Sequence, residues 1–128
     1  RFGEGHIGHV SEAVKHYRSW LKESERGIIC GDFNNSVIWD KSNKESNFKE
    51  TNESLNTLGY QSAYHKLTNE EFGKEKQSTL YHTKNKDKPY HIDYVFLKGI
   101  EPETIAIGSY EDWISLSDHV PVTVITTI

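Results

Sequence analysis

The sequence has no methionine and only one cysteine among its 128 residues. A single cysteine cannot form an internal disulfide, so we expect packing to hold the fold and a reducing compartment, the cytoplasm, to house it. Cys30 is expected to be a small core residue within a strand. Because the chain begins with Arg1 and has no initiator methionine, we expect it to be a piece of a longer protein, whose targeting segments cannot be read from it.

Long hydrophobic runs are also missing. Hydrophobic residues make up 34% of the chain and charged residues 27%, and the mean hydropathy is -0.73, so no segment is expected to span a membrane. The 15 basic residues are outnumbered by 19 acidic ones, which gives a formal net charge of -4 at pH 7. This balance argues against a broad phosphate-binding surface and leaves room for a local one. At this length, residues 1–128 form at most one domain.

The segment from Gly27 to Asn35 organises the rest of the chain. Its isoleucines and cysteine predict a short buried strand, and the glycine, aspartate and asparagine that follow predict a polar tip. Gly31 can adopt backbone angles closed to other residues, and Asp and Asn tolerate turns. Asp32 and Asn34 are therefore expected at the carboxyl end of this strand, where open α/β sheets bind ligands.

Two helices are predicted by hydrophobic periodicity. Apolar residues recur at steps of three and four over 10–21, and Phe48, Leu55 and Leu58 form a second helical stripe over 48–58. Asn47 and Glu50, three positions apart, resemble a capping box at the start of the second helix.

Strands dominate the second half of the chain. The expected strands are 60–64, 78–83, 90–97, 104–107 and 120–128. The segments 78–83 and 90–97 are expected to form a hairpin, and alternation in its second arm places Asp93 on the face opposite Tyr94. Residues 112–117, which precede the last strand, are expected to form a loop. Helices mixed with strands indicate an α/β or α+β fold.

Acids and a histidine occur beside strands at three places: Asp32 with Asn34, then Asp93, then Asp118 with His119. If the first and last strands are antiparallel neighbours, their polar ends share one edge of the sheet. Carboxylates near an imidazole suit cation-assisted hydrolysis of a phosphate ester. Mg²⁺ takes oxygen ligands and needs only one or two protein carboxylates, and histidine titrates near neutral pH.

Each of these residues also has a purely structural interpretation. Asp32 and Asn34 fit an ordinary exit from a strand into a turn. Asp93 fits an ion pair with a nearby lysine, and Asp118 fits the start of a turn. A lone His119 is more often an ordinary surface or core histidine than a catalyst.

Two further patterns contain residue types that occur in catalytic or metal sites. Ser117 lies close to His119, which would suit a serine hydrolase, although proximity in sequence alone supports that reading weakly. His6 and His9 have the spacing of a metal pair, but a chain end is a poor platform for a metal site, so we interpret them as incidental.

Three motifs follow one another along the chain: GDFN at 31–34, HIDYVF at 91–96 and SDHVPV at 117–122. Together they resemble the C-terminal signature of the endonuclease/exonuclease/phosphatase family, which includes exonuclease III, DNase I, neutral sphingomyelinases and inositol polyphosphate 5-phosphatases. The resemblance implies half of a four-layer α/β sandwich, with a mostly antiparallel sheet and helices on its outer face. Residues 1–128 would then be one partial domain, the C-terminal part of such a fold.

The resemblance also implies an activity. The parent protein would be a phosphoesterase that depends on Mg²⁺, with Mn²⁺ as a substitute, and its substrate would be a phosphate ester such as a nucleic acid. Asp32 would orient or deprotonate the attacking water, and Asn34 would hold the water or a phosphate oxygen. His119, oriented by Asp93, would stabilise the phosphoryl oxygen in the transition state. The metal would lie at Asp118 and Asp32.

Complete members of that family are longer than this chain. Their first half supplies an Asn and a Glu for the principal metal site, and residues 1–26 contain no matching motif. This chain alone is therefore expected to bind Mg²⁺ weakly and to hydrolyse little. It is also expected to expose an apolar sheet face, which the missing N-terminal half or a second copy would cover. A catalytically silent binding module with the same fold is the alternative from another class.

Overall fold

The computed structural model describes residues 8–41 and 46–128. It shows a mixed α/β fold with antiparallel sheets, as the sequence predicts. None of the helices in these ranges is both long enough and apolar enough to cross a membrane. In chain order the elements are α1 (His9–His16), α2 (Arg18–Glu23), β1 (Gly27–Asp32), the 3-10 helix η2 (Val37–Trp39), α3 (Phe48–Thr57), β2 (Gln61–Ser62), α4 (Ala63–Thr68), β3 (Leu80–Tyr81), the 3-10 helix η3 (His82–Lys84), β4 (Pro89–Tyr90), β5 (Asp93–Lys98), β6 (Pro102–Ile107), α5 (Tyr110–Trp113) and β7 (Val122–Thr126).

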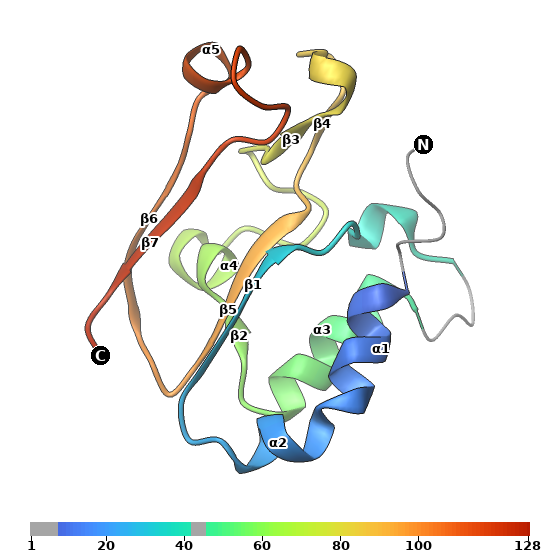
Figure 1. Ribbon diagram of the computed structural model, residues 1–128, viewed down its shortest axis with the longest axis vertical. Helices are drawn as coiled ribbons and strands as arrows, with labels where there is room; N and C mark the ends of the chain where they lie inside the picture. Colours follow the sequence, from blue (N-terminus) through green and yellow to red (C-terminus); the bar gives the residue numbers. More distant parts are fainter. Residues whose placement is uncertain (1–7, 42–45) are drawn as a thin grey trace.

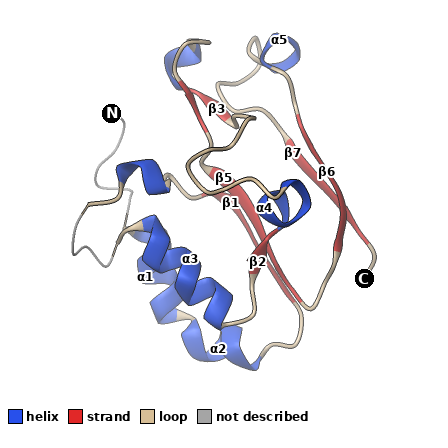
Figure 2. Ribbon diagram, turned by 180° about the vertical axis from the view of Figure 1, so that it is seen from behind, coloured by secondary structure: helices blue, strands red, loops and turns tan. Residues whose placement is uncertain are grey.

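The strands form a three-stranded sheet in the order β1-β5-β2 and two separate two-stranded pairs, β3-β4 and β6-β7. Figure 1 shows α1 and α3 on one side of the three-stranded sheet and the β6-β7 hairpin on the other. Figure 2, seen from behind, shows α4 between the sheet and the hairpin, and α4 contacts both β5 and β6. The sheet therefore has a helical layer on one face and a partial cover on the other.

The register of β1 against β5 assigns their side chains to the two faces. Ile29 lies opposite Phe96, and this pair faces the helices, where Phe96 is fully buried. Asp32 lies opposite Asp93 on the other face. Each large apolar side chain buried on the helical side contributes about 1.5–3 kcal/mol. The cluster of buried residues that pack together contains Val14, Leu21, Phe33, Phe48, Leu55, Leu58, Tyr60, Tyr94 and Phe96.

The prediction that β1 is a buried strand is wrong. Within the described residues β1 pairs only with β5, so it is an edge strand. Ile28 is 52% exposed, and Cys30, expected in the core, is also exposed. The reason is that α4 and β7 pack against β5 and bury Leu97 on this face, whereas β1 lies at the edge of the sheet.

The helix predicted over 10–21 is broken at Tyr17, whose backbone angles (φ -96, ψ 11) are not helical. The break separates α1 from α2 and still allows Val14 and Leu21 to be buried. Tyr17 and Trp20 belong to the same apolar stripe, yet they are 53% and 67% exposed. The apolar stripe is thus wider than the surface against which the two helices pack.

The second predicted helix forms as α3, but its predicted cap is wrong. The Asn47 side chain accepts a hydrogen bond from the backbone N–H of Lys41 (2.9 Å) instead of capping its own helix. The carboxylate of Asp40 takes that role and accepts from the N–H groups of Phe48 (2.7 Å) and Lys49 (3.0 Å). A negative charge at this end also complements the helix dipole.

The predicted hairpin of 78–83 with 90–97 is only partly present. β3 and β4 pair over two residues each, because most of the second arm forms β5 and pairs with β1. Residues 61–62 are the only strand within 60–64, and α5 occupies the start of the expected loop at 112–117. The strands expected over 104–107 and 120–128 are confirmed as β6 and β7.

Candidate active site

Asp32, Asp93 and His119 converge at one end of the sheet. Nδ1 of His119 lies 2.9 Å from Oδ2 of Asp93, and Nε2 of the same ring lies 3.6 Å from Oδ2 of Asp32. One ligand atom from each of the three residues lies within 4.8 Å of the others. All three side chains remain partly accessible, so a small ligand could reach them.

Asp32 and Asp93 are brought together by strand pairing. They are the last residue of β1 and the first of β5, directly opposite each other in the antiparallel register. Gly31 has a φ of +139°, which strains any residue with a side chain, so glycine is needed here for its conformation. Asn34 adopts a left-handed φ of 50°, and its backbone N–H donates to Oδ1 of Asp32 (2.8 Å). This Asx turn fixes the Asp32 carboxylate.

His119 reaches the site by a route that the sequence did not predict. β1 and β7 belong to different sheets, so the condition under which their polar ends would share one sheet edge is not met. Instead, His119 forms an antiparallel bridge with Leu80 of β3, and the N–H of Val120 donates to the carbonyl oxygen of Thr79 (2.9 Å). The β3 segment therefore places the histidine beside the end of the sheet.

Thr79 is a site residue that the sequence analysis missed. It is fully buried, and its Oγ1 accepts from the backbone N–H groups of Ile92 (3.0 Å) and Asp93 (3.1 Å). Its carbonyl oxygen binds the residue after His119, so one residue holds both the acid and the histidine. Its place within a predicted strand was the only signal, and threonine is common in strands.

The electrostatics of the cluster favour an added positive charge. Burial raises the pKa of Asp32, and the nearby charges of Asp93 and Asp118 raise it further, against the N–H of Asn34 and against His119. The hydrogen bond to Asp93 raises the pKa of His119 despite the opposing effect of burial. Crowded carboxylates disfavour their own ionisation, and either a proton on the imidazole or a bound cation would relieve that repulsion.

The donor set fits a divalent cation without selecting one. Two carboxylates suit Mg²⁺, Mn²⁺ or Ca²⁺, and an imidazole nitrogen adds transition metals to the candidates. The family resemblance implied Asp32 and Asp118 as metal ligands, whereas the structure groups Asp32 with Asp93 and His119. Asp118 is half-buried, and its carbonyl oxygen accepts from the N–H of Tyr81 (2.8 Å). The charge of Asp118 raises the pKa values of Asp32 and His119, so its carboxylate lies close to the cluster.

Ser117 has a different role from the one a serine hydrolase would need. Its Oγ accepts from the backbone N–H of His119 (3.1 Å), while both ring nitrogens of His119 face carboxylates. This arrangement disfavours Ser117 as a nucleophile activated by His119. Of the incidental histidine pair, His9 begins α1, and His6 lies outside the described residues.

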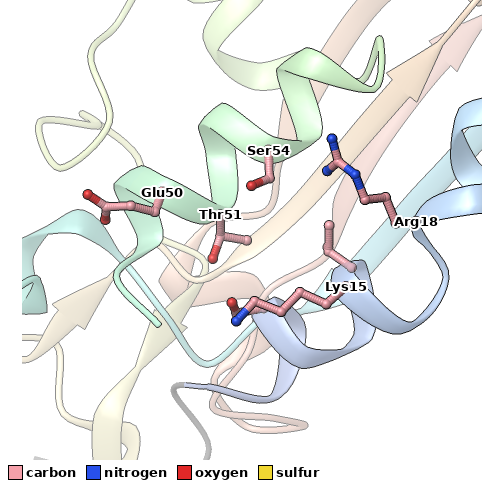
Figure 3. A pocket seen from close by; sticks show the side chains of 7 residues that line it. Lys15, Arg18, Glu50, Thr51 and Ser54 are labelled. Carbon is pink, nitrogen blue, oxygen red and sulfur yellow. The ribbon is translucent and has the colours of Figure 1, made fainter. Parts of the chain in front are cut away.

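A separate cavity of about 230 Å³ lies between α1 and α3. Figure 3 shows its labelled side chains: Lys15 comes from α1 and Arg18 from α2, and Glu50, Thr51 and Ser54 come from α3. None of the clustered acids, nor His119, lines this cavity. The candidate active site is thus distinct from it.

A scan against models of protein families and a search of curated proteins found no match to this chain. Any assignment therefore depends on the geometry of the site and on the three motifs.

Proposed function

We propose that this chain is part of a metal-dependent phosphoesterase, and that phosphodiester hydrolysis of the nuclease type is its reaction. The observation that carries the proposal is the hydrogen bond between His119 and Asp93 beside the carboxylate of Asp32. Three motifs that are far apart in sequence contribute one residue each to this cluster, as the resemblance to the endonuclease/exonuclease/phosphatase family implies.

The proposed roles follow from the protonation of each group. Asp32 orients the attacking water or accepts its proton, because its carboxylate lies beside the His119 ring that would bind the phosphoryl oxygen. His119, kept protonated by Asp93, donates a hydrogen bond from Nε2 to a phosphoryl oxygen. Negative charge develops on these oxygens during in-line attack, so a fixed donor there lowers the barrier. Asn34 holds the water or a phosphate oxygen.

Mg²⁺ is the proposed cofactor, with Mn²⁺ as a substitute. Asp32 would hold it, together with Asp93 or Asp118. Such a cation, when bound, neutralises charge on the phosphoryl oxygens. The repulsion among the three carboxylates supports this proposal, because a cation would remove it.

The complete fold is proposed to be a four-layer α/β sandwich of which this chain is the C-terminal half. The exposed face of β1 and the free edges of β1 and β7 within the described residues support this, since they leave room for further strands. A catalytically silent binding module of the same fold is the competing proposal.

Hydrolysis of bis(p-nitrophenyl) phosphate by the protein at its full natural length tests the proposal. We expect hydrolysis in Mg²⁺, its loss in EDTA and its recovery when Mg²⁺ is restored. A rate that EDTA does not change would overturn the metal-dependent mechanism. Absence of hydrolysis at any Mg²⁺ or Mn²⁺ concentration would favour the silent module. Carboxylic ester cleavage that survives EDTA and disappears in Ser117→Ala would favour a serine hydrolase instead.

A further inference from the structure

A second group of reactive side chains lies on and beside α4, outside the candidate active site. Oγ of Ser62 lies 2.6 Å from Nδ1 of His65, and Nε2 of His65 lies 2.7 Å from Oε2 of Glu75. The side chains of His65 and Glu75 are only 7% and 4% exposed. A hydroxyl, an imidazole and a carboxylate are thus connected in series through the two ring nitrogens.

The protonation of this group can be worked out from its contacts. Burial alone would raise the pKa of Glu75, but hydrogen bonds from His65 and from the backbone N–H of Gly73 outweigh it and keep the pKa below its usual value. Glu75 is therefore ionised at neutral pH and can only accept, so Nε2 of His65 carries the hydrogen. In a neutral imidazole the other nitrogen, Nδ1, is then a bare acceptor. With the ring in this neutral form, the hydroxyl of Ser62 donates to Nδ1.

Ser62 occupies a position where serine normally serves its own helix. It is the N-cap residue of α4, yet its side chain makes no capping hydrogen bond. The hydroxyl instead points to the base of His65, whose ring stacks on Phe72 with centroids 3.6 Å apart. The His65 ring is thus held by a hydrogen bond to the Glu75 carboxylate at its edge and by stacking of its face on Phe72.

A cavity gives access to these groups. It has a volume of about 240 Å³, and Ser62, His65 and Phe72 contribute to its wall. Asn52, Asn56, Gln61 and Lys66 complete the lining. The cavity therefore combines an apolar surface with amide groups able to donate hydrogen bonds to a carbonyl oxygen.

We propose that Ser62, His65 and Glu75 form a second, metal-independent nucleophilic site that accepts small carboxylic esters. The Oγ of Ser62 attacks the ester carbonyl carbon while its proton passes to Nδ1 of His65. The C–O bond to the leaving alcohol then breaks, and the alcohol takes that proton. Water hydrolyses the acyl-serine by the same route and releases the acid. Relative to serine proteases the two ring nitrogens exchange places, which leaves the proton transfers unchanged.

Covalent labelling tests this proposal on the unmodified protein. A fluorophosphonate probe is applied in EDTA, which silences the proposed phosphoesterase, and the labelled peptide is identified by mass spectrometry. We expect a single adduct on Ser62. Absence of an adduct, or an adduct on another residue, overturns the proposal. Because this readout needs no variant and no metal, its failure is independent of the failure of the phosphoesterase proposal.

Variants then test the roles of the three residues. Glu75→Gln lets Nε2 of His65 become an acceptor, which moves the ring hydrogen to Nδ1 and removes the base from Ser62. We expect labelling to slow by about 100-fold or more while the far-UV circular dichroism is unchanged. Ser54→Ala and Ser117→Ala are the matched controls and should label at the wild-type rate. An equal rate in Glu75→Gln and wild type would show that Glu75 does not position the base.

Discussion

The His119 imidazole is joined through Nδ1 to Oδ2 of Asp93, 2.9 Å away, and this bond connects the start of β5 to the segment that leads into β7. It is the largest cause of the raised pKa of His119. The same carboxylate belongs to a residue whose backbone is held by Thr79. Asp93 therefore makes two separate contacts: its carboxylate raises the pKa of His119, and its backbone N–H ties the start of β5 to Thr79.

Replacing Asp93 should lower the pKa of His119. In Asp93→Asn the main stabilisation of the imidazolium is lost and burial still disfavours it, so the pKa should fall, while the charges of Asp32 and Asp118 limit the fall. NMR titration of the His119 ring in metal-free protein measures this. Asp118→Asn is the control and should cause a smaller fall, because its charge is the weakest of the contributions given for His119.

The same pKa shift predicts how stability depends on pH. The pKa of His119 is higher in the folded state, so its contribution is fully present below pH 6.5 and is lost as the pH rises through the folded-state value. The stability difference between wild type and Asp93→Asn should therefore shrink as the pH rises through that range. A difference that grows instead would contradict the assignment of the shift to this bond.

Asp32→Asn should stabilise the protein at pH 7. The carboxylate is disfavoured by burial and by the charges of Asp93 and Asp118, and a neutral amide keeps an oxygen for the N–H of Asn34. We expect a gain of about 0.5 kcal/mol in the free energy of unfolding, measured by urea denaturation. The gain should vanish below pH 3.8, where Asp32 is protonated in both states. Asp87→Asn, on an exposed loop, should show no such gain.

Thr79→Val should destabilise the fold. The substitution keeps the shape of the side chain and leaves two buried backbone donors, the N–H groups of Ile92 and Asp93, without their acceptor. Each orphaned donor costs about 1–3 kcal/mol, so a total of about 2 kcal/mol or more is expected. Thr79→Ser, which retains the oxygen, should cost less, and the exposed Thr104→Val should cost almost nothing. Equal stability of the valine and serine variants would contradict this role.

The uncovered face of β1 should promote self-association of this chain. Ile28 is 52% exposed on an edge strand whose outer backbone groups are unpaired within the described residues. Sedimentation velocity should show concentration-dependent dimers or larger species. Ile28→Lys should shift the distribution toward monomer, whereas Ile38→Lys, at a residue of similar exposure, should not. A monodisperse monomer at all concentrations would argue against this surface.

The structure confirmed the prediction that depended only on the alternation of side chains along one strand. The alternation in 90–97 correctly placed Asp93 and Tyr94 on opposite faces of the strand, because side chains in a strand alternate whatever the strand pairs with. The predicted cap of α3 was wrong because the carboxylate of Asp40, seven residues before Asn47, accepts the hydrogen bond at the start of the helix. Local patterns cannot reveal a competitor that only the tertiary fold brings close.

The sequence indicated which residues belong to the candidate site, but it did not indicate which strands and backbone contacts bring them together. Its three acids and one histidine stand out in sequence, since each adjoins a strand and belongs to one of the three motifs. The assembly of the site depends on β3, which pairs with His119 and belongs to none of the three motifs. It also depends on the hydroxyl of Thr79, which accepts a backbone hydrogen bond only because the fold buries it there. The burial of Cys30 was predicted wrongly because the coverage of a strand depends on elements elsewhere in the fold.

The most direct test of the account is the rate of Mg²⁺-dependent phosphodiester hydrolysis by the full-length protein carrying Asp32→Ala or His119→Ala. General-base and hydrogen-bonding groups of this kind typically contribute 10²–10⁴-fold, so each substitution should lower kcat by about 100-fold or more. Asp87→Ala, which removes an exposed acid from a loop, should retain the wild-type rate. If the Asp32 and His119 variants hydrolyse the substrate as fast as the Asp87 variant, this cluster is not the active site.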